Sequence, residues 1–439
     1  MKILLSAFSC EPHRGSEEGV GWHWAEGLAR LGHDVHVLTH PRGRAAIERY
    51  MADHPQIASL RFHYIDIPHF EAAPGKYKFG SSTAESLLVC PVWQWLAYRY
   101  ARKLHAAERF DLVHHITYGG VRQPSFMGKL GIPFILGPIG GGERAPYRLR
   151  TGYSWRGWAW DVSRDFQNFM IQFEPLMRHT FRSATTIFVK TPESALVIPA
   201  RDRHKAQLGW EIGLAGAGSL QPSPERQRRP GDPLRILFVG RMLHFKGVDF
   251  ALRALHDALG RNANVHLTIV GRGREKDRMV ALAKALDLDR HVTWIDFLPQ
   301  PELFAFYKTH DVFLFPSLHD SSGNVVLEAM GSGLPVVCLD LGGPGILVDA
   351  ASGIVVETKG AGKDRVVSRL GQALKRLDDD AALRRELARG ALDRANGFTW
   401  EAAIRHVYRS VPPLAEAPQP AAIGQEPAAV MRAGGSAAL

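Results

Sequence analysis

The sequence predicts an α/β protein made of two doubly wound domains, each built on a parallel sheet. Three observations lead to this prediction. Short apolar runs alternate with amphipathic segments from residue 2 onward, the same alternation starts again near residue 234, and a polar, Pro-rich stretch separates the two series. Because consecutive parallel strands need a crossover connection, usually a helix, this alternation indicates parallel sheets.

The first domain is expected over residues 1–220. An amphipathic helix at Glu18–Leu31, ended by Gly32, follows the first predicted strand. The strands are predicted at Lys2–Phe8, Asp34–Thr39, Leu112–Ile116 and Phe134–Leu136. Two aromatic and basic stretches, from Trp93 to His105 and from Tyr147 to Met170, lack the alternation of a strand.

A linker at 221–233 leads to the second domain, expected over residues 234–395. Its strands are predicted at Arg235–Val239, Val265–Val270, Val292–Ile295 and Asp311–Phe315, and its helices at Val248–Leu259 and Glu275–Leu286. A last helix lies within 396–412. The remaining residues, 413–439, are rich in Ala, Pro and Gly and are expected to be disordered.

Composition narrows the functional classes. The chain has 54 Lys and Arg against 44 Asp and Glu, a formal charge of +10, which favours anionic partners. No apolar run approaches the roughly 18 residues that span a bilayer, and the N-terminus begins a strand pattern instead of a signal peptide, so a cytoplasmic protein is expected. Three scattered cysteines exclude a disulfide framework. No nucleic-acid module or phosphate-binding Walker loop is present, so nucleic acid is not an expected partner.

The segment from Phe315 to Val337 contains the residue pattern most indicative of a ligand-binding site. It reads as a strand, a loop with Asp320, a helix opened by Gly323, and a further strand. The first N–H groups of such a helix, those of Ser322, Gly323, Asn324 and Val325, suit a diphosphate. Glu328 can accept hydrogen bonds from the vicinal hydroxyls of a ribose, and Asp320 can hold sugar hydroxyls. The alternative is that both acids only favour the helix dipole.

A second run, Val239 to Asp249, places Arg241 and Lys246 in the loop between a strand and a helix. Two cations at the carboxyl end of a strand suit a pyrophosphate leaving group, whose charge they can neutralise as its bond breaks. Solvated surface charges are the alternative interpretation.

The first domain offers weaker signals. Gly19 and Gly21 follow the first strand and can let a ligand approach the backbone, or only form a tight turn. They do not fit G-x-G-x-x-G, so NAD binding is disfavoured. His114 and His115 lie at a strand end, where either a cleft-facing or a core role is open, and we favour His115 as the catalytic one. No metal motif is found, and we expect neither a metal nor a cofactor.

The segments VGRMLHFKGVD, VGRGRE, VTWIDFLP, YKTHDVFLFPS and the D-x7-E block follow one another in an order that resembles the retaining glycosyltransferases of family four. The resemblance covers most of residues 1–412. It implies the GT-B fold, with two Rossmann-like domains facing across a cleft and a C-terminal helix at 396–412 that crosses back to the first domain. It also implies that Arg241 and Lys246 bind the donor diphosphate, Glu328 the ribose, and Asp320 with Ser322–Val325 the donor sugar.

Three departures from the family pattern are visible. Asp320 replaces a glutamate, Gly342–Gly345 lacks the acid of Gly-Gly-x-x-Glu, and the pair His114-His115 replaces His-x-His. These positions are where the donor-sugar contacts and the catalytic histidine of the family would lie.

We therefore predict a glycosyltransferase, and the resemblance implies that it retains anomeric configuration and needs no metal. It would move a sugar from a nucleotide-sugar donor in the second domain to a glycan or lipid-linked acceptor in the first, in surface-polysaccharide biosynthesis. Its basic and aromatic stretches suggest contact with the anionic inner face of the cell membrane. The alternatives are a sugar-nucleotide epimerase on the same fold and a non-catalytic subunit that binds nucleotide sugars.

Overall fold

A computed structural model of the chain describes residues 1–67, 83–214, 228–229 and 231–409. Its residues form two compact units. Unit 1 comprises Met1–Gly142, Phe166–Ile212 and, among the described residues, 400–409; unit 2 comprises Glu143–Asp165 and Gly213–Thr399. The α/β class predicted from the sequence is confirmed, because each unit is built on one parallel sheet.

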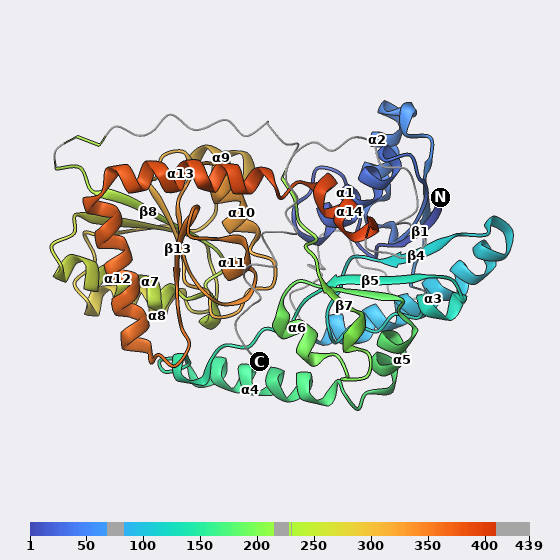
Figure 1. Ribbon diagram of the computed structural model, residues 1–439, viewed down its shortest axis with the longest axis horizontal. Helices are drawn as coiled ribbons and strands as arrows, with labels where there is room; N and C mark the ends of the chain where they lie inside the picture. The colour runs from blue at the N-terminus through green and yellow to red at the C-terminus, as the bar shows by residue number, and fades with distance from the viewer. Residues whose placement is uncertain (68–82, 215–227, 230, 410–439) are drawn as a thin grey trace. The chain divides into compact units, whose positions relative to one another are not determined.

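The sheet of unit 1 has seven strands in the order β3-β2-β1-β4-β5-β6-β7, and all neighbouring pairs are parallel (Figure 1). The strands are β1 Lys2–Ser6, β2 Asp34–Thr39, β3 Leu60–Tyr64, β4 Leu112–His115, β5 Phe134–Ile139, β6 Thr186–Val189 and β7 Ala206–Leu208. The central strands are apolar on both faces because helices cover both sides of such a sheet.

Helices complete unit 1. They are α1 Ser16–Arg30, α2 Arg44–Asp53, α3 Thr83–Glu108, α5 Pro175–Ser183, α6 Pro192–Val197 and α14 Trp400–Arg409, and α4 Trp155–Met170 runs from unit 2 into unit 1. Helix α14 packs on α1, where Gly27 leaves room for the side chain of Ile404. In Figure 1 these two helices, from opposite ends of the chain, lie side by side.

The sheet of unit 2 has six parallel strands in the order β10-β9-β8-β11-β12-β13. The strands are β8 Leu234–Val239, β9 Val265–Val270, β10 Val292–Ile295, β11 Val312–Phe315, β12 Val336–Leu339 and β13 Gly353–Val356. Its helices are α7 Val248–Gly260, α8 Lys276–Ala285, α9 Gln300–Tyr307, α10 Asn324–Gly331, α11 Gly342–Leu347, α12 Lys363–Asp379 and α13 Ala381–Asn396. The strand order reverses at β8, which places its open carboxyl end beside that of β11.

The division into units differs from the sequence-based boundaries in one segment. Residues Glu143–Asp165, expected within the first domain, group with unit 2. The reason is side-chain pairing with the second sheet's connections: Asp161 contacts His244, and Ser154 donates to Glu275 at 3.0 Å. The last helix groups with unit 1.

Two predicted segments, the linker and the C-terminal tail, lie mostly or wholly outside the described residues. Most of the predicted linker at 221–233 and all of the tail at 413–439 fall on residues that the structure does not describe. Within the described ranges, no helix combines the length and the apolar character needed to cross a membrane.

Candidate functional site

Two loops of unit 2 bring the two chemical motifs of the sequence together. One loop follows β8 and contains the short helix His244–Lys246, and the other follows β11 and leads into α10. They are joined by a backbone hydrogen bond from Leu318 N to Phe245 O, 2.8 Å long. Because β8 and β11 are neighbours in the sheet, both loops lie at the same edge.

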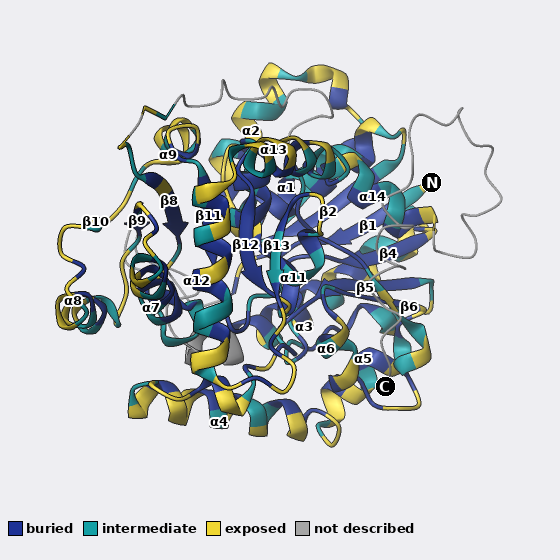
Figure 2. Ribbon diagram, turned by 60° about the vertical axis from the view of Figure 1, so that its left-hand side comes forward, coloured by how far each residue is buried: buried dark blue, intermediate teal, exposed yellow. Residues whose placement is uncertain are grey.

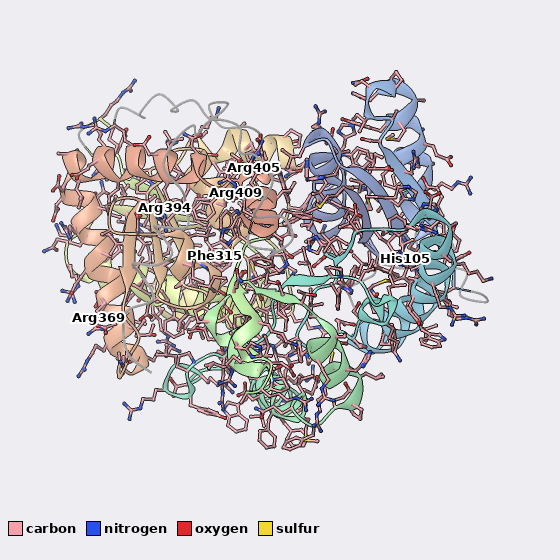
Figure 3. The ribbon with its side chains drawn as sticks, turned by 45° about the vertical axis from the view of Figure 1, so that its right-hand side comes forward. His105, Phe315, Arg369, Arg394, Arg405 and Arg409 are labelled. Atoms are coloured by element: carbon pink, nitrogen blue, oxygen red, sulfur yellow. The ribbon has the colours of Figure 1, made fainter. Side chains whose placement is uncertain are left out.

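Lys246 and Asp320 form an ion pair across these loops. Both side chains are largely shielded from solvent, and the ammonium lies 5.5 Å from the ring centre of Phe315. Phe315, labelled in Figure 3, is the last residue of β11. Burial raises the pKa of Asp320, but the Lys246 charge and two backbone N–H donors outweigh it, so the pKa lies below its ordinary value. The carboxylate therefore stays ionised at neutral pH.

Arg241, the other predicted cation, is exposed. Its guanidinium makes no ion pair and no side-chain hydrogen bond within the described part of the chain. It is thus available to an anionic ligand, whereas Lys246 must share its charge with Asp320.

At the start of α10, some backbone N–H groups are available to a ligand and others are already used. Gly323 holds a left-handed conformation with φ of 69° at the N-cap. The carboxylate of Asp320 accepts the N–H groups of Ser322 at 3.3 Å and Gly323 at 3.0 Å. Among the described residues, the N–H groups of Asn324 and Val325 have no acceptor. A diphosphate at this helix terminus would meet these two groups first.

Glu328, predicted to hold a ribose, lies about a turn inside α10 and is half-buried. Tyr307, at the end of α9, donates its hydroxyl to Glu328 Oε2 at 3.1 Å. Burial raises the pKa of Glu328 to about 7, although the tyrosine hydrogen bond acts in the opposite direction. The charge of this group therefore changes near neutral pH.

The glycine segment that departs from the family pattern packs on the Asp320 loop. Gly343 donates its backbone N–H to Asp320 O at 2.7 Å. A Cβ atom at Gly343 would lie 2.6 Å from Ser321 O, so only glycine fits without movement of that loop. The segment therefore fixes the backbone that positions Asp320.

Glu143 also belongs to this region, although no motif in the sequence indicated it as a site residue. It is buried, accepts the hydroxyl of Ser321 at 2.7 Å, and its carbonyl accepts Arg164 at 2.5 Å. In the sequence, Glu143 ends the glycine-rich segment Gly137–Glu143.

The two candidate histidines, His114 and His115, are fully buried in unit 1. His114 contacts the hydroxyl of Tyr408 through Nδ1 at 3.0 Å and Gly137 O through Nε2 at 2.6 Å. His115 Nε2 lies 3.1 Å from Thr117 O, and its Nδ1 has no hydrogen-bond partner among the described residues. Burial lowers the pKa of each, to about 3 and about 4, so both are neutral. The catalytic role of His115 stays a prediction.

Gly19 and Gly21 lie inside α1 and not in the loop before it. The space at each glycine is filled by the backbone of the preceding loop, near Arg14 O and Ser9 O. Their contact with a ligand stays a prediction, and the structure gives them a packing role. Nearby, a small open pocket is lined by Phe8, Ser9, Cys10, Glu11, Glu18, His40, Arg42 and Gly43.

A further cluster in unit 2 joins Asp161 of α4 to His244 and His319 of the two loops. Asp161 Oδ1 lies 3.1 Å from His244 Nε2 and 3.4 Å from His319 Nε2. Burial lowers the pKa of His319 to about 4, so this ring is neutral at pH 7. No spacing in the sequence connects Asp161 with the two histidines.

Two family models match the two halves of the chain. A model described as "Glycosyl transferase 4-like domain" matches residues 15–208, and one described as "Glycosyl transferases group 1" matches residues 221–389. A D-inositol 3-phosphate glycosyltransferase of Corynebacterium diphtheriae is 31% identical over 205 residues, which is 44% of this chain and 47% of that protein. The chain spans about half the length of the curated relatives it matches.

Solved structures share the fold over nearly the whole chain. A sucrose-phosphate synthase from Thermosynechococcus elongatus has a TM-score of 0.62 at 19% identity. The matched region covers 92% of this chain and 96% of the synthase chain. HepE of Anabaena in complex with UDP has a TM-score of 0.56 at 15% identity, with 94% and 100% covered. At such identities the likeness concerns the fold alone.

Proposed function

The chain belongs to the family-four glycosyltransferases, which have the GT-B fold, and we propose that it transfers a sugar from a nucleotide-sugar donor to an acceptor hydroxyl. One observation carries the proposal. The loops after β8 and β11 place Arg241, Lys246 and Asp320 at one edge of the unit 2 sheet, beside the helix that bears Glu328. Cations, free N–H groups and a carboxylate are what a diphosphate and a ribose need.

In the proposed reaction, the bond between the anomeric carbon and the phosphate oxygen breaks, and the nucleoside diphosphate leaves with the electron pair. Lys246 and Arg241 neutralise the charge that develops on it. The acceptor hydroxyl attacks the anomeric carbon, and its proton passes to the leaving phosphate oxygen. Attack from the side of the leaving group retains the configuration, without a metal.

We propose that unit 1 binds the acceptor, a glycan or a lipid-linked sugar of surface-polysaccharide biosynthesis. A structural neighbour is titled a lipopolysaccharide outer core galactosyltransferase, which supports this class. The curated relatives are named for inositol 3-phosphate, so a phosphorylated polyol is a second class of acceptor. His115 is retained as the proposed catalytic histidine.

The test of the function uses the full chain and a panel of nucleotide sugars with different bases and sugars. Calorimetry should find one class of nucleotide sugar that binds. When a matching acceptor is added, NMR of the product should show the anomeric configuration of the donor. Interconversion of the donor sugar without an acceptor would instead identify an epimerase. Binding without turnover, even with membrane extract, would identify a non-catalytic subunit. An inverted product would exclude retention.

Donor affinity is expected to rise with pH through neutrality. Glu328 must be ionised to accept two ribose hydroxyls, and its pKa of about 7 leaves it mostly protonated at pH 6. Between pH 6 and pH 8 the dissociation constant should therefore fall about 10-fold. Calorimetry with an intact nucleotide sugar measures this, because its diphosphate lacks the terminal phosphate that titrates near pH 6 in a free nucleotide.

The matched variant is Glu328→Gln, which keeps the shape and removes the charge. It should weaken binding by about 1–3 kcal/mol at pH 8 and abolish the pH dependence. A variant whose affinity still rises 10-fold would show that another group is responsible. Tyr307→Phe should keep the pH dependence but move it to higher pH, because it removes the hydrogen bond that lowers the pKa of Glu328 and leaves the carboxylate.

We also propose that α4 docks on an anionic membrane surface. Aromatic side chains along it are exposed, among them Trp155 at 76% and Phe166 at 62%, and Figure 2 shows the exposed face of the helix. Exposed arginines, such as Arg148 and Arg156, lie on or beside the helix. Aromatic rings with arginines suit the interface of an anionic bilayer.

Vesicles that contain phosphatidylglycerol should therefore sediment the protein. Replacing Trp155 and Phe166 together by serine should reduce the bound fraction several-fold, whereas Phe297→Ser should not, although Phe297 is equally exposed at 62%. Salt should weaken binding as it screens the arginines. Equal binding of all three proteins, or none by the wild type, would contradict membrane docking.

A further inference from the structure

The cluster of Asp161, His244 and His319 has the chemistry of a metal site. Two imidazoles and one carboxylate offer ligand atoms that all lie within 4.8 Å of one another. Imidazole and carboxylate together are common ligands of zinc and other first-row divalent metals. The three residues come from α4 and from the loops after β8 and β11, all within unit 2.

The separations from Asp161 to each histidine fit coordination. Two ligands at 2.0–2.1 Å from a tetrahedral metal lie about 3.3 Å apart. Asp161 Oδ1 lies 3.1 Å from His244 Nε2 and 3.4 Å from His319 Nε2. Both ring nitrogens therefore approach the same carboxylate oxygen, as ligands around one centre would.

Hydrogen bonding does not account for the whole cluster. His319 is 5% exposed, and its Nε2 has no hydrogen-bond partner among the described residues, although it faces Asp161. A buried imidazole nitrogen without a partner is costly. A metal ion between His319, His244 and Asp161 would satisfy it.

Aromatic packing holds both rings in place. His319 is stacked on Phe245 with ring centres 3.8 Å apart and is parallel to Trp160 within 7°. Tyr153 meets His244 edge-on at 4.8 Å. Rings fixed in this way present their nitrogens in a set direction, which favours metal binding over rearrangement.

The surrounding charges are compatible with a divalent cation. Arg150 donates to Asp165 Oδ2 at 2.7 Å and contacts Asp161 Oδ2, the oxygen away from the histidines, at 3.4 Å. Arg164 pairs with Glu143 at 3.5 Å. Each of these buried arginines therefore has a carboxylate other than Asp161. A second contact to the outer oxygen of a ligating carboxylate is usual around metals.

We propose that Asp161, His244 and His319 bind one divalent transition metal, with zinc the best fit, as a structural clamp between α4 and the two loops. His244 is two residues from Lys246, and His319 immediately precedes Asp320. The metal would thus fix the loops that carry the Lys246–Asp320 pair. The inference uses only these contacts and does not depend on the proposed reaction.

The test uses the full chain, stripped with a chelator and reloaded with zinc or cobalt. Mass spectrometry of metals should find about one ion per chain after removal of free metal. Cobalt should give the visible absorption of a low-coordinate nitrogen and oxygen site. Zinc should raise the melting temperature by several degrees, and none of these effects should appear with His319→Gln or Asp161→Asn.

The control is His310→Gln, which alters another buried histidine of unit 2 outside the cluster. This variant should bind metal as the wild type does. Equal metal content in wild type and His319→Gln would overturn the proposal. If both ligand variants fail to fold, the wild-type cobalt spectrum decides: a spectrum like that of aqueous cobalt excludes the site.

Discussion

Replacing Lys246 by alanine should lower kcat/KM for transfer by about 10²–10³-fold. The ammonium is the shielded cation of the proposed donor site, and its loss removes charge neutralisation as the diphosphate departs. It also leaves the Asp320 carboxylate without its partner in a poorly solvated position. Initial rates with donor and acceptor varied separately measure the effect.

Loss of stability must be separated from loss of catalysis. Lys375→Ala is the matched control, because Lys375 forms an exposed ion pair with Asp379 and should change neither rate nor melting temperature. The double variant Lys246→Met, Asp320→Asn removes both charges of the buried pair, so it should regain stability and remain inactive. A double variant that recovered transfer would show that Lys246 only balances Asp320.

Gly343→Ala should give the second large effect. The added methyl group would lie 2.6 Å from Ser321 O, so the loop that carries Asp320 must shift. Such overpacking costs about 1–3 kcal/mol. For a unit of this size, each 1 kcal/mol lowers the melting temperature by about 2–4 °C. The affinity for the donor should fall as well, because a shift of this loop moves Asp320 and the N–H groups at the start of α10.

Gly362→Ala provides the comparison within the same unit. A methyl group added at Gly362 would have no described atom within 4 Å, and this residue precedes α12 with an ordinary negative φ of −83°. This substitution should leave donor binding unchanged. If Gly343→Ala also bound donor normally, the glycine segment would have no part in shaping the site.

The placement of two loops at one edge of the unit 2 sheet was predictable because both loops follow strands. Arg241 and Lys246 come after one predicted strand, and Asp320 after another. A doubly wound sheet brings such strand ends to one edge, so the sequence alone indicated that these residues meet. The strand predictions near them needed corrections of only a residue or so, since continuous apolar runs mark buried parallel strands well.

Other features depend on contacts between distant parts of the chain. Asp320 already accepts hydrogen bonds from the N–H groups of Ser322 and Gly323. These bonds depend on the loop conformation, which residue spacing does not specify. Asp161 reaches the histidines from a helix that the sequence placed in the other domain. The strands β3, β6 and β7 of unit 1 were not predicted from the sequence.

The course of the chain between the two units limits how relatives can be recombined. The backbone passes from one unit to the other after Gly142, Asp165, Ile212 and Thr399. A chimaera made with a single crossover near residue 213 would pair α1 with a foreign α14 and would lose the native match between Gly27 and Ile404. Exchange of donor specificity within this family should therefore graft Glu143–Asp165 together with Gly213–Thr399 and keep the host's own terminal helix.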